Sequence, residues 1–275
     1  MKNVVLNNGI EMPWIGLGTY PMRGEECQNA VESAAAAGYM LFDTSAIYRN
    51  AEAIGTAFKN SFLRREDYFL MTKISNRLQE TRNVRAALTD TLHFLRLDYV
   101  DMYLLHWPNP GTYIECYQQM EELQKEGLTR AIGVSNFHEH HLEKLFQYSS
   151  IVPAVNQVEL HPLLSQEKLA NFCTQRGITM ISYSPFARMH EKLMEHPVLL
   201  ALAEKYGVKV TQIIVRWNYQ HGYIVIPKSA NPVRQRENIF VDTFELTETE
   251  MRDIDACNED FRVRYNPDTC DFTKL

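Results

Sequence analysis

The feature that most constrains the fold is the alternation of short apolar runs with amphipathic helical patterns along the whole 275-residue chain. Turn residues bound each apolar run and a segment with helical periodicity follows it, as expected for parallel strands joined by helices. Eight such units in a chain of this length predict an α/β fold, a (β/α)8 TIM barrel forming a single domain over residues 1–275. The predicted strands cover residues 15–19, 40–43, 68–72, 100–105, 131–134, 154–157, 179–183 and 223–226.

The connections between these runs have their own patterns. A hairpin is expected to precede the barrel, because residues 4–6 and 10–12 flank the turn Asn7-Asn8-Gly9, and Asn-Gly supplies the positive φ values of a tight turn. Two segments, residues 186–197 and the tail after residue 260, are expected to be irregular. Helices are expected at residues 25–37, 84–95, 114–126, 142–148, 166–176 and 211–221.

A doubly wound open sheet is the alternative architecture, and it requires a glycine-rich dinucleotide loop. In the stretch that begins at Gly16-Leu17-Gly18, Pro21 stands where the third glycine would be. The dinucleotide fingerprint therefore fails, which favours the barrel.

Charge and cysteine content exclude several classes of protein. The net charge of −6 argues against non-specific nucleic-acid binding, so any anion site must be a local cluster. No apolar run approaches the length of a membrane span, and residues 1–9 are too short and polar for a signal peptide. The cysteines form no CxxC pair, which predicts reduced thiols in a cytoplasmic protein; they are Cys27, Cys116, Cys173, Cys257 and Cys270.

Polar side chains stand at the carboxyl ends of the apolar runs, which in a barrel line one shared cavity. A phenol with a reference pKa near ~10 needs help to act as an acid near neutrality, and an ammonium held by a carboxylate would supply it. Individually, Asp43 is also explained as a helix cap, Lys73 as a loop lysine and His106 as a core histidine. The joint pattern favours one site containing Thr19, Asp43, Tyr48, Lys73, His106, Ser135, Asn136, Gln157, Tyr183, Ser184, Lys228 and Ser229.

These stretches, in this order, resemble the aldo-keto reductase family over the whole chain. The resemblance is carried by residues 16–19, 41–45 with Tyr48, 72–73, 104–108, 132–137, 156–157, 183–185 and 226–229, and by Arg234, Glu237 and Asn238. It implies a catalytic tetrad of Asp43, Tyr48, Lys73 and His106. Tyr48 would donate a proton to the carbonyl oxygen, Lys73 paired with Asp43 would lower the phenol pKa, and His106 would orient the substrate.

The resemblance also implies a nicotinamide cofactor. Ser135, Asn136 and Gln157 would hold the carboxamide and Tyr183 would stack on the ring. Lys228, Ser229 and Arg234 would bind the adenosine 2′-phosphate, which favours NADPH over NADH. The full cofactor set is Gly18, Thr19, Asp43, Ser135, Asn136, Gln157, Tyr183, Ser184, Pro185, Lys228, Ser229, Arg234, Glu237 and Asn238.

Substrate contacts are expected from Tyr20, Ile47, Tyr48, His106 and Trp107, with Trp14 and Phe186 as further candidates for an apolar wall. The short connection after Pro108 and the short tail resemble compact bacterial members close to diketogluconate reductases. They imply an open site that reduces small aldehydes, ketones, dicarbonyls or keto-sugars to alcohols.

Two alternatives differ in class: a non-catalytic nicotinamide-binding regulatory subunit, and an unrelated barrel lyase or isomerase. The intact tetrad argues against the first, and the lack of a phosphate-binding glycine loop or metal ligand set argues against the second. The cluster His138-Glu139-His140-His141 is expected to be a solvated helix start, and no metal is expected. The family is commonly monomeric, so a monomer without nucleic-acid or membrane partners is predicted.

Overall fold

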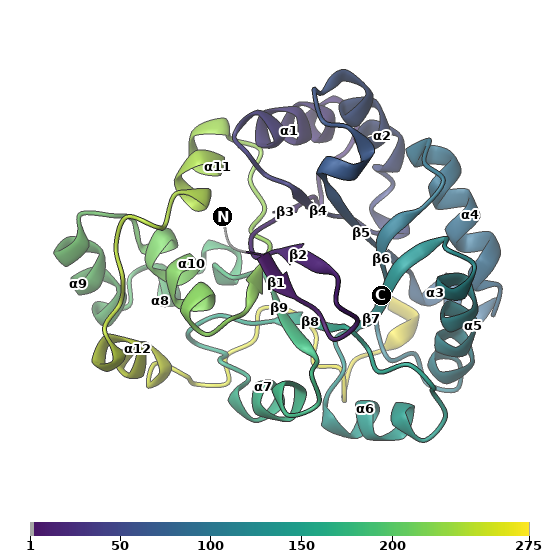
Figure 1. The fold of residues 1–275 in the computed structure, drawn as a ribbon. Coiled ribbons are helices and arrows are strands. Elements are labelled where there is room, and N and C mark those ends of the chain that lie inside the picture. Colours follow the sequence, from purple (N-terminus) through teal and green to yellow (C-terminus); the bar gives the residue numbers. More distant parts are fainter. Residues whose placement is uncertain (1–2, 275) are drawn as a thin grey trace.

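Eight parallel strands form one curled sheet in the computed structural model, which describes residues 3–274 (Figure 1). Met1, Lys2 and Leu275, at the ends of the predicted domain, lie outside the described residues. Neighbouring strands follow the order of the sequence from β3 to β10, as expected for successive βα units. The strands are β3 (Leu17–Gly18), β4 (Leu41–Asp43), β5 (Phe69–Ile74), β6 (Val100–Leu105), β7 (Thr129–Ser135), β8 (Val155–Glu159), β9 (Thr179–Tyr183) and β10 (Ile224–Val225).

Backbone hydrogen bonds also join the first and last strands of this sheet. Ile15, just before β3, forms a parallel bridge with Val225 in β10. The Gly16 amide donates to the Val225 carbonyl and the Val225 amide donates to the Trp14 carbonyl, both at 2.9 Å. The predicted strands are confirmed within a few residues, and the arrangement fits an α/β barrel.

The predicted hairpin is present and covers one end of the barrel. It consists of β1 (Asn3–Val5) and β2 (Glu11–Pro13), paired antiparallel, with Gly9 at φ +82° in the turn. The Asn7 side chain donates to the carbonyl of Pro153, shortly before β8 begins, at 3.0 Å. The hairpin therefore lies at the amino-terminal ends of the strands, across the middle of the ring in Figure 1.

Two apolar layers hold the barrel together. Inside it, Leu6 and Met12 from the hairpin pack with strand residues such as Met71 and Leu104, all nearly inaccessible to solvent. Outside it, a larger cluster fills the space between the strands and the surrounding helices. Only the carboxyl ends of the strands are left for a polar cavity.

The helices surround the strands, and the six that were predicted are confirmed with shifted ends. Residues 186–197 are more regular than predicted, because they contain η3, α8 and the start of α9. The helices are α1 (Gly24–Ala36), α2 (Ala51–Asn60), α3 (Asn76–Glu80), α4 (Val84–Leu95), α5 (Tyr113–Lys125), α6 (Glu139–Phe146), α7 (Glu167–Thr174), α8 (Glu191–Met194), α9 (Pro197–Tyr206), α10 (Val210–Gln220), α11 (Pro232–Ile239) and α12 (Glu248–Asp255). Short 3-10 turns occur at η1 (Ala46–Tyr48), η2 (Arg65–Asp67), η3 (Ala187–Met189) and η4 (Phe272–Lys274).

Helix α4 illustrates how local sequence sets these boundaries. The Asn83 side chain accepts a hydrogen bond from the Ala86 amide and caps the first turn, and Arg96 adopts a left-handed conformation that ends the helix. Where α2 packs against this end, a Cβ on Gly55 would collide with the carbonyl oxygen of Leu95. Glycine is therefore required at that position for the two helices to approach.

No helix within residues 3–274 is both long and apolar enough to cross a membrane.

Candidate active site

A cavity of about 990 Å³ opens at the carboxyl ends of the strands. It receives residues from the ends of several different strands, as expected for a site built on a barrel. From the predicted set it is lined by Gly18, Tyr20, Asp43, Ile47, Tyr48, His106, Trp107, Ser135, Asn136, Gln157, Tyr183, Ser184, Pro185, Lys228, Ser229, Arg234, Glu237 and Asn238.

Asp43 and Lys73 form a buried ion pair at the base of this cavity. Asp43 is the last residue of β4 and Lys73 lies near the end of the adjacent β5, which places Lys73 Nζ 2.5 Å from Asp43 Oδ1. Lys73 also donates to the Thr44 carbonyl at 2.9 Å, and Gln157 donates to the same carboxylate oxygen at 3.1 Å. Burial raises the pKa of Asp43 and lowers that of Lys73, and the contact between the two opposes both shifts.

Tyr48 ends the short turn η1 that follows this carboxylate. Its ring centroid lies 5.3 Å from Lys73 Nζ, 5.9 Å from the His106 ring and 5.1 Å from the Tyr20 ring. Burial, and next the charge of Asp43, raise the pKa of Tyr48 well above its usual value, whereas the guanidinium of Arg264 lowers it. The expected depression by Lys73 does not prevail, because Asp43 offsets the ammonium charge and the phenol is desolvated. Tyr48 is therefore protonated at neutral pH.

His106 follows β6 and faces the cavity beside Tyr48. Burial, and next the charge of Lys73, hold the pKa of its imidazole well below the usual value, so the ring is neutral at neutral pH. Its Nδ1 lies 3.2 Å from the hydroxyl of Ser45, a buried residue, and that hydroxyl donates to the Lys73 carbonyl at 3.3 Å. A serine hydroxyl has one proton, so while Ser45 donates to the Lys73 carbonyl it can only accept from Nδ1 of His106. The ring proton resides on Nε2 in the alternative arrangement, in which Ser45 turns its proton to Nδ1. Ser45 was missing from the predicted set, although it stands in the stretch that carries the family resemblance.

Ser135, Asn136, Gln157 and Tyr183 form one polar wall of the cavity. The Tyr183 hydroxyl donates to Asn136 Oδ1 at 2.7 Å, and Asn136 Nδ2 donates to the His106 carbonyl at 2.9 Å. Ser135 donates to the backbone carbonyl of Gln157 at 2.8 Å. Much of the Asn136 amide is therefore engaged by protein groups, whereas the side-chain oxygen of Gln157 has no hydrogen bond from another described residue. Ser135 Oγ also accepts from Asn136 Nδ2 at 3.2 Å, and its remaining lone pair together with the Gln157 oxygen suits the amide group of a ligand.

A cationic region lies at another part of the cavity, where α11 begins. Asn231 caps this helix by accepting from the amides of Val233 and Arg234. Lys228 is exposed and lies 3.8 Å from Glu26, whereas the Arg234 guanidinium has no ion pair within residues 3–274. Two cations near a hydroxyl suit a phosphate dianion. The nearby Glu237 pairs with Lys209 at 2.5 Å, and Asn238 is buried.

Three predicted residues do not line the cavity. Lys73 lies behind Asp43. Thr19 is fully buried. Its hydroxyl donates to the Asp43 carbonyl at 2.9 Å and accepts from Asn50 at 3.0 Å, so it holds the backbone of Asp43 in position without reaching the cavity. Trp14 packs against Tyr219 in the core, with ring centroids 4.4 Å apart, and the apolar wall expected from it is wrong. Phe186 does line the cavity.

The C-terminal tail contributes cavity residues that sequence reasoning missed, among them Arg264 and Tyr265. The amides of Val263 and Arg264 donate to the carboxylate of Glu159 at 2.7 and 3.0 Å. Glu159 is fully buried at the end of β8 and also lies 3.2 Å from His161. The signal in the sequence for this anchor was a charged residue two positions after the predicted strand 154–157.

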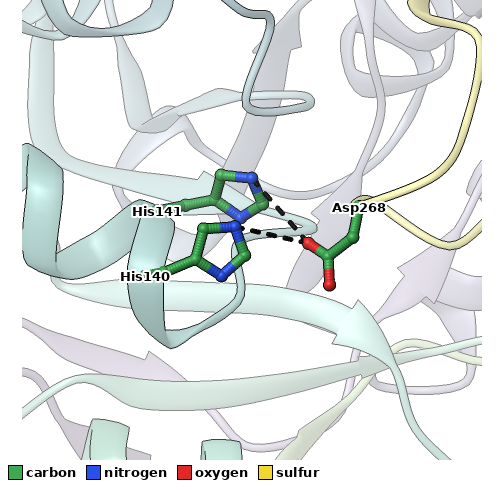
Figure 2. A group of neighbouring side chains, drawn as sticks. All are labelled: His140, His141 and Asp268. Carbon is green, nitrogen blue, oxygen red and sulfur yellow. Dashed lines mark ion pairs between the residues drawn. The ribbon is translucent and has the colours of Figure 1, made fainter.

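A second link holds the tail to the start of α6. One ring nitrogen of His140, one ring nitrogen of His141 and one carboxylate oxygen of Asp268 lie within 4.8 Å of one another (Figure 2). His138 Nδ1 lies 2.8 Å from Asp268, and its Nε2 lies 3.2 Å from Arg262. Because only His140 is well exposed, the expectation of a solvated helix start is wrong for His138 and His141.

Hydrogen bonding accounts for the geometry of this cluster. His141 Nδ1 accepts from the His138 amide at 3.1 Å. Burial, and next the charge of His140, lower the pKa of His141 to about 4, so the ring is neutral and its proton resides on Nε2. The nitrogen facing Asp268 thus carries a proton instead of a free lone pair. The cluster ties the tail to the loop that follows Ser135 and Asn136.

The sequence matches the model of the Aldo/keto reductase family over residues 14–259. Among characterised proteins, it is 44% identical to a glyoxal reductase of Bacillus subtilis, covering 96% of both chains. It is 40% identical to the methylglyoxal reductase DkgA of Escherichia coli K12, again covering 96% of both chains.

Solved structures show the same similarity. An aldo-keto reductase from a Medee basin deep-sea metagenome library has a TM-score of 0.94 and 37% identity, covering 98% of this chain and 99% of that one. An aldo-keto reductase of Bombyx mori, solved in complex with NADP, has a TM-score of 0.89 and 35% identity, covering 97% and 95%.

Proposed function

We propose that this chain, which belongs to the aldo/keto reductase family and is an oxidoreductase acting on carbonyl groups, reduces small aldehydes, ketones and dicarbonyls with NADPH. The observation that carries the proposal is the meeting of a protonated phenol, a buried ion pair and a neutral imidazole at one cavity wall. The glyoxal and methylglyoxal reductases among its relatives support small dicarbonyls as substrates.

Tyr48 is proposed as the proton donor. Reduction of a carbonyl adds a hydride to carbon and a proton to oxygen, and bound NADPH supplies the hydride. The raised pKa keeps the phenol in the form that can donate, and Tyr48 lines the cavity where the carbonyl oxygen must sit.

Lys73 is proposed to stabilise the phenolate as its proton leaves. An ammonium has three N–H donors, and in this site two of them are used by Asp43 and the Thr44 carbonyl. The third has no acceptor among the described residues, and the ammonium nitrogen lies 5.3 Å from the centroid of the Tyr48 ring. Asp43 holds the ammonium charged in a buried place, so the cation is in position before the proton moves.

His106 is proposed to hold the carbonyl oxygen beside Tyr48. Because its ring is neutral, a hydrogen bond to that oxygen requires the proton to be on Nε2. Ser45 would favour this tautomer when it turns its single proton from the Lys73 carbonyl to Nδ1, 3.2 Å away. Together the imidazole and the phenol would fix the carbonyl in one orientation.

The polar groups of the cavity fit NADP(H) in two places. Ser135 and Gln157 offer acceptors for a carboxamide beside the ring of Tyr183, close to the proposed proton donor. Lys228, Ser229 and Arg234 would hold a 2′-phosphate at the start of α11, and the NADP complex of the Bombyx mori relative supports this choice of cofactor.

A non-catalytic nicotinamide-binding regulatory subunit is the competing function. Absorbance at the dihydronicotinamide band separates the two, measured with glyoxal, methylglyoxal and aromatic aldehydes in turn. Oxidation of NADPH by at least one of them is expected. If none is reduced although NADPH binds with quenched protein fluorescence, the chain is a binding module and the proposal fails.

Two further expectations remain proposals. We propose that the protein is monomeric and cytoplasmic, and its cysteines support the second point. All five fall within the described residues as free thiols, four of them buried.

A further inference from the structure

His138, at the start of α6, contacts the C-terminal tail at two points. Its Nδ1 lies 2.8 Å from a carboxylate oxygen of Asp268, and its Nε2 lies 3.2 Å from a guanidinium nitrogen of Arg262. Arg264 and Tyr265, which line the cavity, lie between these two contacts in the sequence. One imidazole therefore holds both ends of the tail segment 262–268 against α6.

The two partners fix the protonation state of this ring. An ionised carboxylate can only accept a hydrogen bond, and a guanidinium can only donate one. Nδ1 must therefore carry a proton to reach Asp268, and Nε2 must offer its lone pair to Arg262. The neutral ring with its proton on Nδ1 satisfies both contacts. A second proton, on Nε2, would face an N–H group of Arg262 and place two cations side by side.

The contact with Arg262 holds the part of the tail that enters the cavity. Among residues 3–274 the Arg262 guanidinium forms no ion pair with a carboxylate, so His138 is the partner that fixes it. The next two amides, those of Val263 and Arg264, donate to the buried carboxylate of Glu159 at 2.7 and 3.0 Å. Weakening the contact with His138 would loosen the chain directly before these amides.

Movement of this segment would change the cavity near the proposed proton donor. The guanidinium carbon of Arg264 lies 5.8 Å from the Tyr20 ring centroid, and the Tyr20 and Tyr48 ring centroids are 5.1 Å apart. Arg264 also lies 5.6 Å from the ring centroid of Tyr265. These contacts connect His138, which does not itself line the cavity, to the place where a carbonyl group would bind.

We propose that His138 is a positioning residue for carbonyl reduction: its neutral imidazole holds the tail through Arg262 and Asp268, and a second proton on the ring frees the Arg262 end. This inference rests on the proposed reductase function and deepens it by adding control by pH. Histidine is the side chain that ordinarily changes charge between about pH 5 and 8. Acid should therefore loosen the tail on its cavity side, while Asp268 still binds the charged ring, and KM for the substrate should rise.

The neighbouring histidines are not expected to give this response. The ring centroids of His140 and His141 lie 6.4 and 6.1 Å from that of His138. Burial, and next the charge of His140, lower the pKa of His141 to about 4, so this ring stays neutral in most of the range. His140 faces the tail at Asp268, 3.4 Å away, and not at Arg262 (Figure 2). The charged and titratable groups around the cluster are Glu139, His140, His141 and Lys144 on α6, Arg262 and Asp268 on the tail, and Tyr113 on α5.

The test is the ratio of KM in the parent to KM in His138→Gln, measured with methylglyoxal and NADPH across a pH series. Glutamine offers an N–H group for Asp268 and a carbonyl oxygen for Arg262, and it cannot take up a proton. Titration of Tyr48 and His106 is common to both proteins and cancels in the ratio. We expect a ratio near one at about pH 7.5 that rises roughly 3- to 10-fold by about pH 5.5, the range for losing one hydrogen bond. Arg262→Met should show the raised KM already at about pH 7.5, and its KM should not follow the parent's rise in acid.

Hydrogen exchange gives a second measurement that needs no turnover. After correction for the intrinsic effect of pH, exchange of the Val263 and Arg264 amides should quicken in acid in the parent and not in His138→Gln. His140→Gln is the control, because it removes an exposed ring of the same cluster that contacts Asp268 alone on the tail among the described residues, and it should follow the parent in both measurements.

Two results would overturn the inference while leaving the reductase function standing. One is a pH profile of KM and of exchange that is parallel in the parent and in His138→Gln. The other is a His140→Gln variant that behaves like His138→Gln, since the response would then belong to the cluster as a whole. If no carbonyl compound oxidises NADPH in the parent or the control, the proposed function itself has failed, and the positioning role fails with it.

Discussion

The buried pair of Asp43 and Lys73 allows a prediction whose size follows from the structure. The Lys73 side chain is fully buried and that of Asp43 is 5% exposed, with their charged atoms 2.5 Å apart. At an effective dielectric constant of ~20, the attraction is at most about 7 kcal/mol. Asp43→Asn keeps an acceptor for Lys73 and Gln157 but removes the charge. We expect it to lower the free energy of unfolding by about 3–5 kcal/mol, because an uncompensated ammonium stays buried.

The cost should depend on pH with a defined sign. Burial already lowers the pKa of Lys73, and in the Asp43→Asn variant no carboxylate charge opposes this shift. Between the Lys73 pKa of the folded variant and the higher Lys73 pKa of the folded parent, the folded parent holds a proton that the folded variant lacks, whereas the two unfolded chains bind the Lys73 proton equally. Stability of the variant relative to the parent should therefore rise with pH in this window, by up to ~1.4 kcal/mol per pH unit.

A double-mutant cycle measured by urea and thermal unfolding tests this reasoning. Asp43→Asn alone should lower the Tm by roughly 10 °C. Adding Lys73→Met removes the buried charge, so the double variant should be more stable than the two single losses together imply, by ~2 kcal/mol or more. Additive losses within ~0.5 kcal/mol, or a gap to the parent that does not change with pH, would refute the account of this pair.

Two further predictions concern the cofactor and the imidazole. Arg234→Ala should raise the Kd for NADPH roughly 10- to 100-fold and that for NADH less than ~3-fold, measured by fluorescence titration; equal losses would remove the 2′-phosphate assignment. Ser45→Ala should lower kcat/KM roughly tenfold with a change in stability within ~1 kcal/mol, because Nδ1 of His106 loses its hydrogen-bond partner. A variant with the parent's activity would show that Ser45 has no such role.

The sequence was sufficient to predict the order of strands and most of the cavity wall. Asp43, Lys73 and His106 each end an apolar run, and this was enough to predict that they lie close together, because parallel strands bring their carboxyl ends to one end of the barrel. The end of β10 illustrates the same logic, since Lys228 and Ser229 follow it and line the cavity. These positions depend on periodicity, which can be recognised in a single chain.

Other features depend on long-range contacts that have no period. Arg264 reaches the cavity because the amides beside it bind Glu159, more than a hundred residues earlier in the chain. Trp14 was expected at the cavity wall, but hydrophobicity alone does not distinguish a wall from the core, where it packs against Tyr219. The direction of the Tyr48 pKa shift likewise depends on burial, which the spacing of Asp43, Tyr48 and Lys73 does not reveal.

The most direct test of the proposed reductase is the Tyr48→Phe variant, which removes the phenol oxygen and keeps the ring that packs beside Tyr20 and His106. NADPH oxidation with methylglyoxal and NADPH binding should be measured on the same preparation. We predict that kcat falls by ~100-fold or more, the range for loss of a general acid, while the Kd for NADPH stays within ~3-fold of the parent. Turnover within tenfold of the parent would contradict the assignment of Tyr48 as the proton donor.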